Sequence, residues 1–355
     1  MDFFKEGKVK FFAEDKQLKK ADVFFNPKRK FDRDLNVLLV SSLMPENSSG
    51  LELFSGSGVR GLRLCIETGK FSVFSFNDIK SSGIVEKNLE ANREKLFKID
   101  KKVTGFDAAS FEAGKKYDYI DIDPFGSPVF YLNSALRLLK KNGILAVSAT
   151  DTAALLGSAQ RACMRKYGSV SLKTAYSNEL GIRILIKKVM EEAAAHSIRL
   201  LPLLFNFEGN FLRVYFKSVS SNGKEKTGYA YQCSKCPSRQ IKEEIKCSYC
   251  GSNVHRIGKL WLGPLYSKKH VIKMLSALNE SNPDFAADSV LKLSDYLTRL
   301  SKELDVFSYY TTSQISSFLK QPELSMSGFK DKTVLSPKGF RIKESFSDFL
   351  NNNLK

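Results

Sequence analysis

Between residues 50 and 149 the sequence alternates short apolar runs with longer amphipathic segments. This alternation is typical of a parallel sheet whose strands are connected by helices. It predicts strands at residues 50–54, 71–77, 102–106, 117–122 and 143–149, with helices at 81–96 and 128–140. The chain is therefore expected to have an α/β fold.

The segment that follows predicts how the sheet ends. After a helix at residues 179–195, two further apolar runs at 200–207 and 211–219 are joined by Glu208-Gly209-Asn210. A connection this short makes an antiparallel hairpin. Five parallel strands completed by a hairpin are typical of the Rossmann-like class I methyltransferase sheet, whereas a dinucleotide-binding sheet normally adds its sixth strand in parallel.

Beyond a polar linker at residues 221–226 the composition changes. A cysteine cluster is followed by helical segments around residues 267–280 and 287–304. Since 355 residues are too many for one compact unit, we expect two domains, at residues 1–225 and 226–355. The pattern leaves residues 1–35 ambiguous and the fold of residues 265–355 open.

The charge of the chain points to a polyanionic partner. Lysine and arginine number 56 against 38 aspartates and glutamates, a net charge of +18. Such an excess attracts nucleic acid, although it can also serve only to solvate the surface. The chain has no apolar run long enough to cross a bilayer and no signal-peptide core, so we expect a cytoplasmic protein with no membrane contact and no evident protein partner.

Glycines and acids at the ends of the predicted strands suggest a nucleotide-like cofactor. In the turn after the first strand, Gly56 and Gly58 let backbone amides approach a ligand, a pattern that fits NAD equally well. Asp78 ends the second strand, where either cofactor class uses an acid on the ribose. Asp107 ends the third strand and can accept from an adenine amine, while the amide of Ala108 donates to the ring. An acid there favours S-adenosylmethionine, the alternative being a helix cap before residues 110–113.

The most specific signal is Asp121-Ile-Asp123-Pro124-Phe125-Gly126-Ser127-Pro128, directly after the fourth strand. An exocyclic amine of guanine has its lone pair delocalised into the ring, so it becomes nucleophilic only when acceptors hold its protons. Asp123 and the carbonyl of Pro124 can be those acceptors. Phe125 offers a flat face on which the extruded base can stack. The alternative is a proline-rich turn whose aspartate caps the next helix.

Several strings together resemble the transfer RNA guanine-N2 dimethyltransferase family of the archaeal type. They are Ile122-Asp-Pro-Phe-Gly-Ser-Pro128, Phe25-Asn26-Pro27, Arg33-Asp34-Leu35-Asn36, the glycine turn and Ala149-Thr150-Asp151-Thr152. The family places two methyl groups from two S-adenosylmethionine molecules on guanosine 26 of tRNA. The resemblance covers roughly residues 3–260.

The resemblance implies roles for individual residues. The family's cofactor residues correspond here to Arg33, Arg60, Asp78, Asp107 and Ala108, and its catalytic acid and stacking aromatic to Asp123 and Phe125. The chain departs from the family twice. Glu52 stands where Asp is more usual, which keeps the acceptor for the cofactor but lengthens its reach, and Phe25 replaces a common tyrosine.

Four of the six cysteines form two close pairs, Cys233-x2-Cys236 and Cys247-x2-Cys250. Two such pairs can deliver four thiolates to one tetrahedral zinc, and a closed site of this kind is structural. Redox use is the alternative, but these cysteines lack the strand-to-helix setting of a dithiol oxidoreductase. The second domain is thus expected to be a smaller zinc-containing, tRNA-binding domain.

The expected function is methyl transfer from S-adenosylmethionine to N2 of a guanine in tRNA, giving N2,N2-dimethylguanosine at position 26. Two alternatives stay open. One is a DNA adenine-N6 methyltransferase, which uses a similar acid-proline-aromatic string, and the other is a noncatalytic RNA-binding protein with the same fold. The number of methyl groups, the use of a neighbouring guanine and the oligomeric state are not determined by the sequence.

Overall fold

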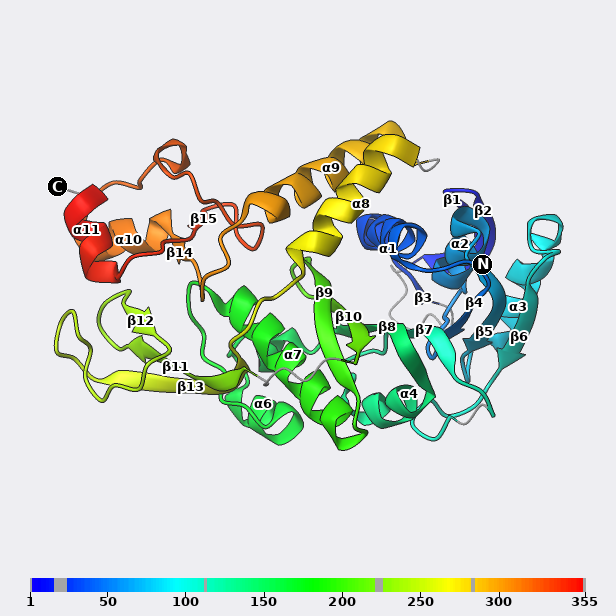
Figure 1. Ribbon diagram of the computed structural model, residues 1–355, viewed down its shortest axis with the longest axis horizontal. Helices are drawn as coiled ribbons and strands as arrows, with labels where there is room; N and C mark the ends of the chain where they lie inside the picture. Colours follow the sequence, from blue (N-terminus) through cyan, green and yellow to red (C-terminus); the bar gives the residue numbers. More distant parts are fainter. Residues whose placement is uncertain (1, 16–23, 112–113, 221–225, 282–284, 354–355) are drawn as a thin grey trace.

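A seven-stranded sheet forms the centre of the molecule (Figure 1). The computed structural model describes residues 2–15, 24–111, 114–220, 226–281 and 285–353. In spatial order the strands are β6 (Asp100–Thr104), β5 (Phe71–Asn77), β4 (Ser48–Glu52), β7 (Tyr117–Ile122), β8 (Leu139–Ala149), β10 (Leu212–Val219) and β9 (Arg199–Phe207). The first five are parallel, and β10 lies antiparallel between β8 and β9. The predicted α/β class and the closing hairpin are confirmed.

The predicted strands at residues 71–77 and 117–122 match β5 and β7 in full, whereas other boundaries were wrong by a few residues. The helix predicted at residues 81–96 ends six residues early, at Glu90, and a separate 3-10 helix follows at Arg93–Lys95. Among the strands the largest error is at β8, which begins at Leu139 instead of residue 143. The helix before β8 stops at Leu138. The register between β8 and β7 shifts between Tyr117 and Tyr119. Asn142 in this irregular stretch has a φ of 61°. The polar residues 140–142 form a bulge within the strand, so the apolar pattern marks only its second part.

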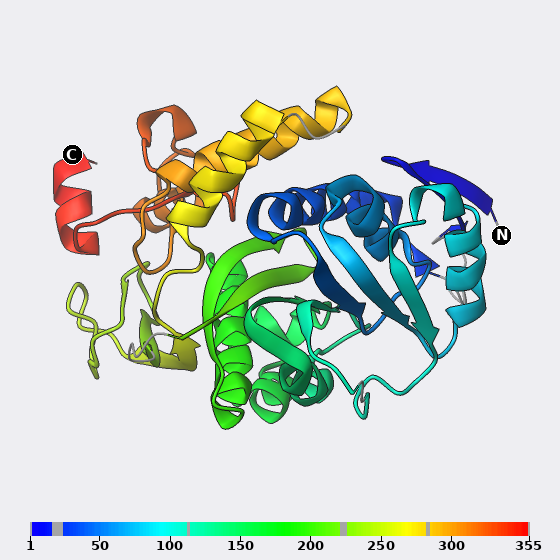
Figure 2. The ribbon, with the colours of Figure 1, turned by 45° about the vertical axis from the view of Figure 1, so that its right-hand side comes forward.

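Two groups of helices lie on opposite sides of the sheet (Figure 1). One consists of α1 (Lys30–Leu43), α2 (Val59–Thr68) and α3 (Ser82–Glu90); the other consists of α4 (Leu132–Leu138), α5 (Thr152–Leu155), α6 (Gln160–Tyr167) and α7 (Ser177–Ala195). Short 3-10 helices lie at η1 (Pro27–Arg29), η2 (Arg93–Lys95) and η3 (Val129–Tyr131). Figure 2 shows α7 along the sheet, where it packs against β9 and β10. In the described part of the chain, no helix has the length and apolar character needed to cross a membrane.

The N-terminal residues, which the sequence left ambiguous, form a small sheet of β1 (Asp2–Glu6), β2 (Val9–Asp15) and β3 (Phe24–Phe25). Two asparagines of the α3 region hold it: Asn88 Oδ1 accepts from the Phe12 amide at 2.7 Å, and Asn92 Nδ2 donates to the Lys10 carbonyl at 2.6 Å. The sheet is thereby fixed beside the helices that follow β4 and β5.

The C-terminal part has a three-stranded sheet and several helices. Its elements are β11 (Thr227–Cys233), β12 (Arg239–Gln240), β13 (Val254–Trp261), α8 (Lys268–Ser281), α9 (Ala287–Lys302), β14 (Tyr310–Thr311), α10 (Thr312–Leu319), η4 (Met326–Gly328), β15 (Gly339–Phe340) and α11 (Phe346–Asn353). Helices α8 and α9 confirm the two predicted helical segments, and both pack against α1. Most of the predicted linker, residues 221–225, lies outside the described residues, and the domain boundary at 225/226 stays a prediction.

A buried ion cluster joins α7 to the C-terminal part. Glu179 accepts from Arg183 on the same helix at 2.7 Å and pairs with Arg341 at 2.8 Å. The Arg341 guanidinium also donates to Glu303, just after α9, at 2.6 Å. Burial raises the pKa of Glu179, but Arg341 and Arg183 outweigh it and the pKa is lowered. Each charge in the cluster is therefore compensated, as buried ions require.

Replacing Arg341 should destabilise the protein strongly. Arg341→Met leaves Glu179 and Glu303 buried with a partner missing, and we expect it to lower the free energy of unfolding by roughly 3–5 kcal/mol. Urea denaturation measures the change. Lys338→Met is the matched control, because the Lys338–Glu323 pair is about half exposed and screened by solvent. Equal losses in the two variants would contradict a structural role for the buried cluster.

Candidate active site

A pocket of about 360 Å³ opens where the carboxyl ends of β4, β5 and β7 meet. It is lined by nearly every residue that the sequence proposed for the cofactor or the chemistry, namely Arg33, Glu52, Gly56, Arg60, Asp78, Asp107, Ala108, Asp123 and Phe125. Gly58 is not in the lining, although it begins α2 in the left-handed conformation with a φ of 74°. Strands far apart in the sequence thus bring the proposed residues to one cavity.

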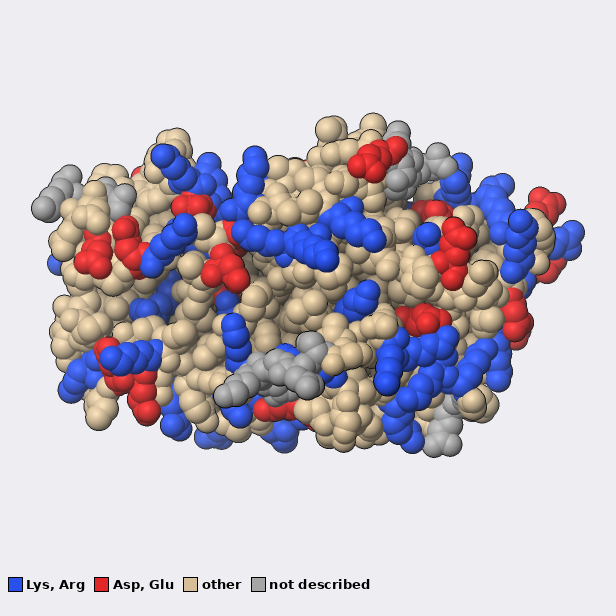
Figure 3. All heavy atoms as spheres, in the orientation of Figure 1, with Lys and Arg blue, Asp and Glu red and all other residues tan. Residues whose placement is uncertain are grey.

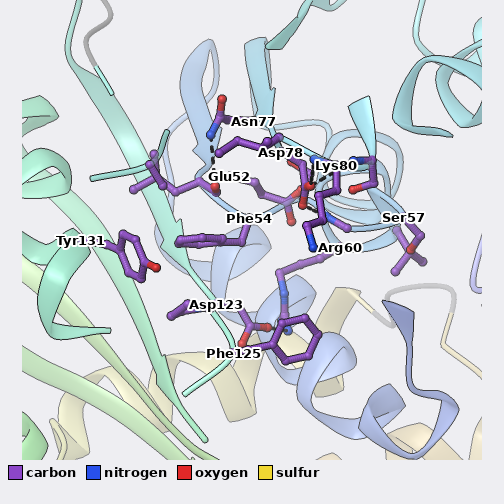
Figure 4. A pocket seen from close by; sticks show the side chains of 18 of the residues that line it. Glu52, Phe54, Ser57, Arg60, Asn77, Asp78, Lys80, Asp123, Phe125 and Tyr131 are labelled. Atoms are coloured by element: carbon purple, nitrogen blue, oxygen red, sulfur yellow. Dashed lines mark hydrogen bonds and ion pairs between the residues drawn. The ribbon is translucent and has the colours of Figure 1, made fainter. Parts of the chain in front are cut away.

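Asp78 connects the glycine turn to the end of β5. Its Oδ2 accepts from the Gly56 amide at 2.9 Å, and its Oδ1 accepts from the amides of Lys80 and Ser81 at 3.0 and 3.1 Å. The two carboxylate oxygens offer about four acceptor sites, so Asp78 is oriented by the backbone and can still accept from a ligand. Figure 4 shows it across the pocket from Asp123.

Asp107 and Ala108 lie at the neighbouring edge of the same pocket. Asp107 is exposed, and its Oδ1 accepts from the Ala109 amide at 3.0 Å, which forms a local turn. The helix-cap alternative involved residues 110–113, of which 112 and 113 lie outside the described residues. The carbonyl of Ala108 accepts from Ser134 Oγ at 2.6 Å, which fixes the backbone here.

Two of the predicted cofactor residues have unexpected surroundings. The Arg33 guanidinium donates to both Glu6 oxygens at 2.7 and 2.5 Å, so the predicted contact of Arg33 with a cofactor stays a prediction. Glu52 is buried, and its Oε2 has no hydrogen-bond partner among the described residues. Burial, and then the charge of Asp121, raise the pKa of Glu52 well above its usual range. Burial therefore favours the protonated form of Glu52, which lines the pocket.

Asp123 is surrounded by three arginines. Its Oδ2 accepts from Arg60 at 3.1 Å and lies 3.4 Å from Arg213 Nη1, while its Oδ1 is 3.7 Å from Arg29 Nη1. Burial raises the pKa of Asp123, but Arg213, Arg60 and Arg29, in that order, outweigh it, so the pKa is lowered. An ionised carboxylate of low basicity is suited to accept hydrogen bonds and poorly suited to remove a proton.

The arginines are themselves held by buried acids. Arg60 pairs with Asp32 on α1 at 2.8 Å, and Arg213 on β10 pairs with Asp121. Arg29, Arg213 and Asp32 are parts of the site that were not expected from the sequence. Arg29 and Asp32 flank the strings at 25–27 and 33–36, which could have drawn attention to them. Arg213 lies in an apolar strand, and nothing in its local sequence marks it.

The loop that carries Phe125 is fixed from the end of β8. The Gly126 amide donates to Thr150 Oγ1 at 2.6 Å, and the Thr150 amide donates back to the Gly126 carbonyl at 2.9 Å. This reciprocal pair gives a physical reason for the string at residues 149–152. Phe125 itself is 78% exposed, and Figure 4 shows it at the pocket beside Asp123 and Arg60. An exposed ring next to an acceptor is suited to stack on a planar molecule.

The four paired cysteines converge in the C-terminal sheet. Their sulfurs lie within 4.8 Å of one another, with Cys233 3.4 Å from Cys250 and Cys236 3.6 Å from Cys247. Tetrahedral zinc with bonds of about 2.3 Å would separate its thiolates by roughly 3.8 Å. The four sulfurs could therefore hold one zinc ion.

Comparison with known proteins places this site in a family. Residues 7–348 match the family model for N2,N2-dimethylguanosine tRNA methyltransferase. A relative from Saccharolobus islandicus, named tRNA (guanine(26)-N(2))-dimethyltransferase, is 32% identical over 97% of this chain and 96% of its own length. One from Aquifex aeolicus, named tRNA (guanine(26)-N(2)/guanine(27)-N(2))-dimethyltransferase, is 30% identical over 92% of this chain and 88% of its own.

A solved structure agrees with this match along the whole chain. It comes from Pyrococcus horikoshii and is described as a complex of Trm1 with S-adenosyl-L-methionine. It superposes with a TM-score of 0.84 at 27% identity and covers 99% of both chains. The pocket, the acids around it and these matches lead to one conclusion: the chain belongs to the N2,N2-dimethylguanosine tRNA methyltransferase family.

Proposed function

We propose that the protein transfers methyl groups from S-adenosylmethionine to N2 of guanine 26 in tRNA. The observation that carries the proposal is the single pocket in which acids for a nucleoside, Asp78 and Asp107, face an ionised Asp123 beside an exposed Phe125. The relatives named above support the reaction and its position in tRNA. The Pyrococcus horikoshii structure, described with S-adenosyl-L-methionine, supports the cofactor.

The pocket fits S-adenosylmethionine, which supplies a methyl group already activated on a sulfonium. We infer that Asp78 accepts from the ribose hydroxyls, and that Asp107 and the Ala108 amide bind the adenine. Glu52 lines the pocket, and we infer that its carboxyl group accepts from the positively charged ammonium of the cofactor. Such a contact would also favour the ionised form of Glu52, whose pKa burial raises.

Asp123 orients the amine and keeps its lone pair available. Its carboxylate and the carbonyl of Pro124 accept the amine hydrogens, which favours a more tetrahedral nitrogen directed at the methyl group. Because the pKa of Asp123 is lowered, the negative charge is present throughout and stabilises the positive charge that develops on nitrogen. After transfer the nitrogen would be positively charged and strongly acidic, so its proton can pass to water.

The two alternative functions receive less support. The family match covers residues 7–348, and the relatives are named for tRNA, not for DNA. A noncatalytic protein would have no need to keep Asp123 ionised among three arginines at the cost of burying the charges of Arg60, Arg213 and Asp121. Methylation assays with tRNA and DNA side by side distinguish the three functions.

We further propose that residues 226–355 form a zinc-containing domain that binds tRNA. Lys and Arg side chains are spread over the face shown in Figure 3, where they outnumber the acidic ones. In addition, Lys217 on β10 and Lys269 and Lys273 on α8 surround His270, and together with burial they lower its pKa. This basic cluster of Lys217, Lys269 and Lys273 spans both proposed domains and suits a phosphate backbone. The cytoplasmic location stays a prediction.

Removing the Asp123 carboxylate should separate catalysis from cofactor binding. We expect Asp123→Ala and Asp123→Asn to lower methyl transfer at least about 100-fold, because the charge opposite the amine is lost. Affinity for S-adenosylmethionine should change little, as measured by calorimetry. Asp107→Asn is the matched control and should show the reverse, with weak cofactor binding and recovery at saturating cofactor. Near-normal turnover of a folded Asp123 variant would refute the acceptor role.

Zinc should stabilise the C-terminal part. Metal analysis of protein purified without chelator should give about one zinc per chain, since four converging thiolates bind zinc tightly. A strong chelator should lower the melting temperature, and Cys236→Ser should abolish zinc binding. Cys163→Ser, which alters a buried cysteine far from the cluster, should retain the metal. Metal content well below one per chain in wild-type protein would rule out the zinc site.

Binding of tRNA should depend steeply on salt. Each phosphate contact contributes close to one unit to the slope of log affinity against log salt concentration on duplex regions. If the basic cluster contacts the backbone, replacing both Lys269 and Lys273 by Gln should flatten the slope by about one to two units. The full chain is used because α8 and α9 pack against α1. An unchanged slope would mean that these lysines only solvate the surface.

A further inference from the structure

The two carboxylate oxygens of Asp123 are not equivalent. Oδ2 lies 3.1 Å from Arg60 and 3.4 Å from Arg213, and both arginines are buried. Oδ1 has Arg29 as its nearest cation, at 3.7 Å, which is too long for a hydrogen bond. The scaffold therefore contacts Oδ2 more closely than Oδ1, and Oδ1 is the more available oxygen for a substrate amine.

Arg29 is held at the pocket by the string at residues 25–27. Asn26 begins the 3-10 helix η1: its Oδ1 accepts from the Lys28 amide at 3.1 Å, and its carbonyl accepts from the Arg29 amide at 3.1 Å. The Arg29 guanidinium lies 4.0 Å from the centre of the Phe211 ring, at the tip of the hairpin between β9 and β10. Its side chain is 19% exposed and lines the pocket.

Arg29 retains donors for a ligand. A guanidinium has five N–H groups, and within the described residues its only ion-pair partner is Asp123 at 3.7 Å. Arg29 is thus a charged hydrogen-bond donor next to an acceptor, Asp123, on one wall of the pocket. Such a pair is complementary to a base edge on which an acceptor and a donor are neighbours.

Guanine offers such an edge on only one side of its amine. The amine on C2 has N1–H, a donor, on one side and N3, an acceptor, on the other. A carboxylate with two available oxygens could accept hydrogen bonds from N1–H and from the amine at the same time. Here Oδ2 faces Arg60 and Arg213, and the group beside Oδ1 is the donor Arg29. The side of the base that faces Arg29 must then be the N3 side.

We propose that Arg29 is a further substrate-binding residue, which donates a hydrogen bond to N3 of the target guanine while Asp123 Oδ1 accepts from the amine. The inference rests on the proposed function and adds the orientation of the base. Phe211 packs against the Arg29 guanidinium at 4.0 Å and supports it at the pocket wall. The string Phe25-Asn26-Pro27 acquires a role as the support of Arg29.

A tRNA carrying 3-deazaguanosine at the target position tests the proposal, because it keeps the amine and N1–H but has C–H in place of N3. Single-turnover rates are measured at saturating cofactor and about pH 8, where Asp123 is ionised whether or not Arg29 is present. The single-turnover rate of the wild-type enzyme should be roughly 10- to 100-fold lower on the modified tRNA than on normal tRNA, which is the range for the loss of a hydrogen bond to a charged donor. The single-turnover rate of Arg29→Met on normal tRNA should be lower than that of wild type by a similar factor. Because the contact with N3 is already missing in this variant, 3-deazaguanosine should lower its rate by less than about two-fold more.

Lys28→Met is the matched control, since Lys28 is an exposed cation in the same 3-10 helix. It should respond to 3-deazaguanosine as wild type does. If Arg29→Met does not fold, as judged by its melting temperature, Arg29→Lys takes its place, because a lysine cannot reproduce the planar donor.

Three results would overturn the proposal. If Arg29→Met and 3-deazaguanosine each lower the single-turnover rate and their factors multiply when combined, Arg29 and N3 are not partners. A flatter salt dependence of tRNA binding in Arg29→Met would assign Arg29 to a phosphate, and a loss of cofactor affinity would assign it to S-adenosylmethionine. Failure of the wild-type enzyme to methylate N2 of guanine in normal tRNA would instead refute the proposed function. This outcome is distinct because it involves neither the Arg29 variant nor the modified tRNA.

Discussion

The site depends on a buried network in which arginines and carboxylates alternate. Arg60 on α2 bridges Asp32 on α1 and Asp123 after β7, and Arg213 on β10 bridges Asp121 and Asp123. Removing such charges from water is costly, and the cost is offset only when each charge has a partner in good geometry. The elements that carry these residues can therefore pack in one arrangement, which also fixes the direction of the Asp123 carboxylate.

The same network separates two neighbouring acids by their protonation. Glu52 and Asp123 both line the pocket, but the pKa of Glu52 is raised by burial and by Asp121, whereas the pKa of Asp123 is lowered because nearby arginines outweigh its burial. Groups whose environments shift their pKa in opposite directions can take different tasks in one cavity. In the proposed function, Glu52 lies on the cofactor side of the pocket, and the ionised Asp123 accepts from the amine.

Much of this arrangement could be predicted from the sequence, because it follows from local patterns. The apolar periodicity located β5 and β7 in full, and the short connection at 208–210 predicted the hairpin. Residues at the ends of parallel strands were expected to meet because such strands share an edge. Arg213 could not be predicted in this way, since its partners Asp121 and Asp123 lie some 90 residues earlier and only the three-dimensional pairing of β10 with β8 brings them together. The N-terminal sheet escaped prediction because side chains from the α3 region hold it.

The position of β10 has a consequence for biosynthesis. Asp121 and Asp123 are translated well before residue 213, and the strand that brings their counter-charge inserts between β8 and β9 only after the hairpin turn has left the ribosome. Until then the nascent chain holds two like charges two residues apart without Arg213. The first half of the sheet can form early, but the interior of the pocket matures only when its last two strands arrive. In this protein, completion of the sheet and completion of the ion network around Asp123 are the same event.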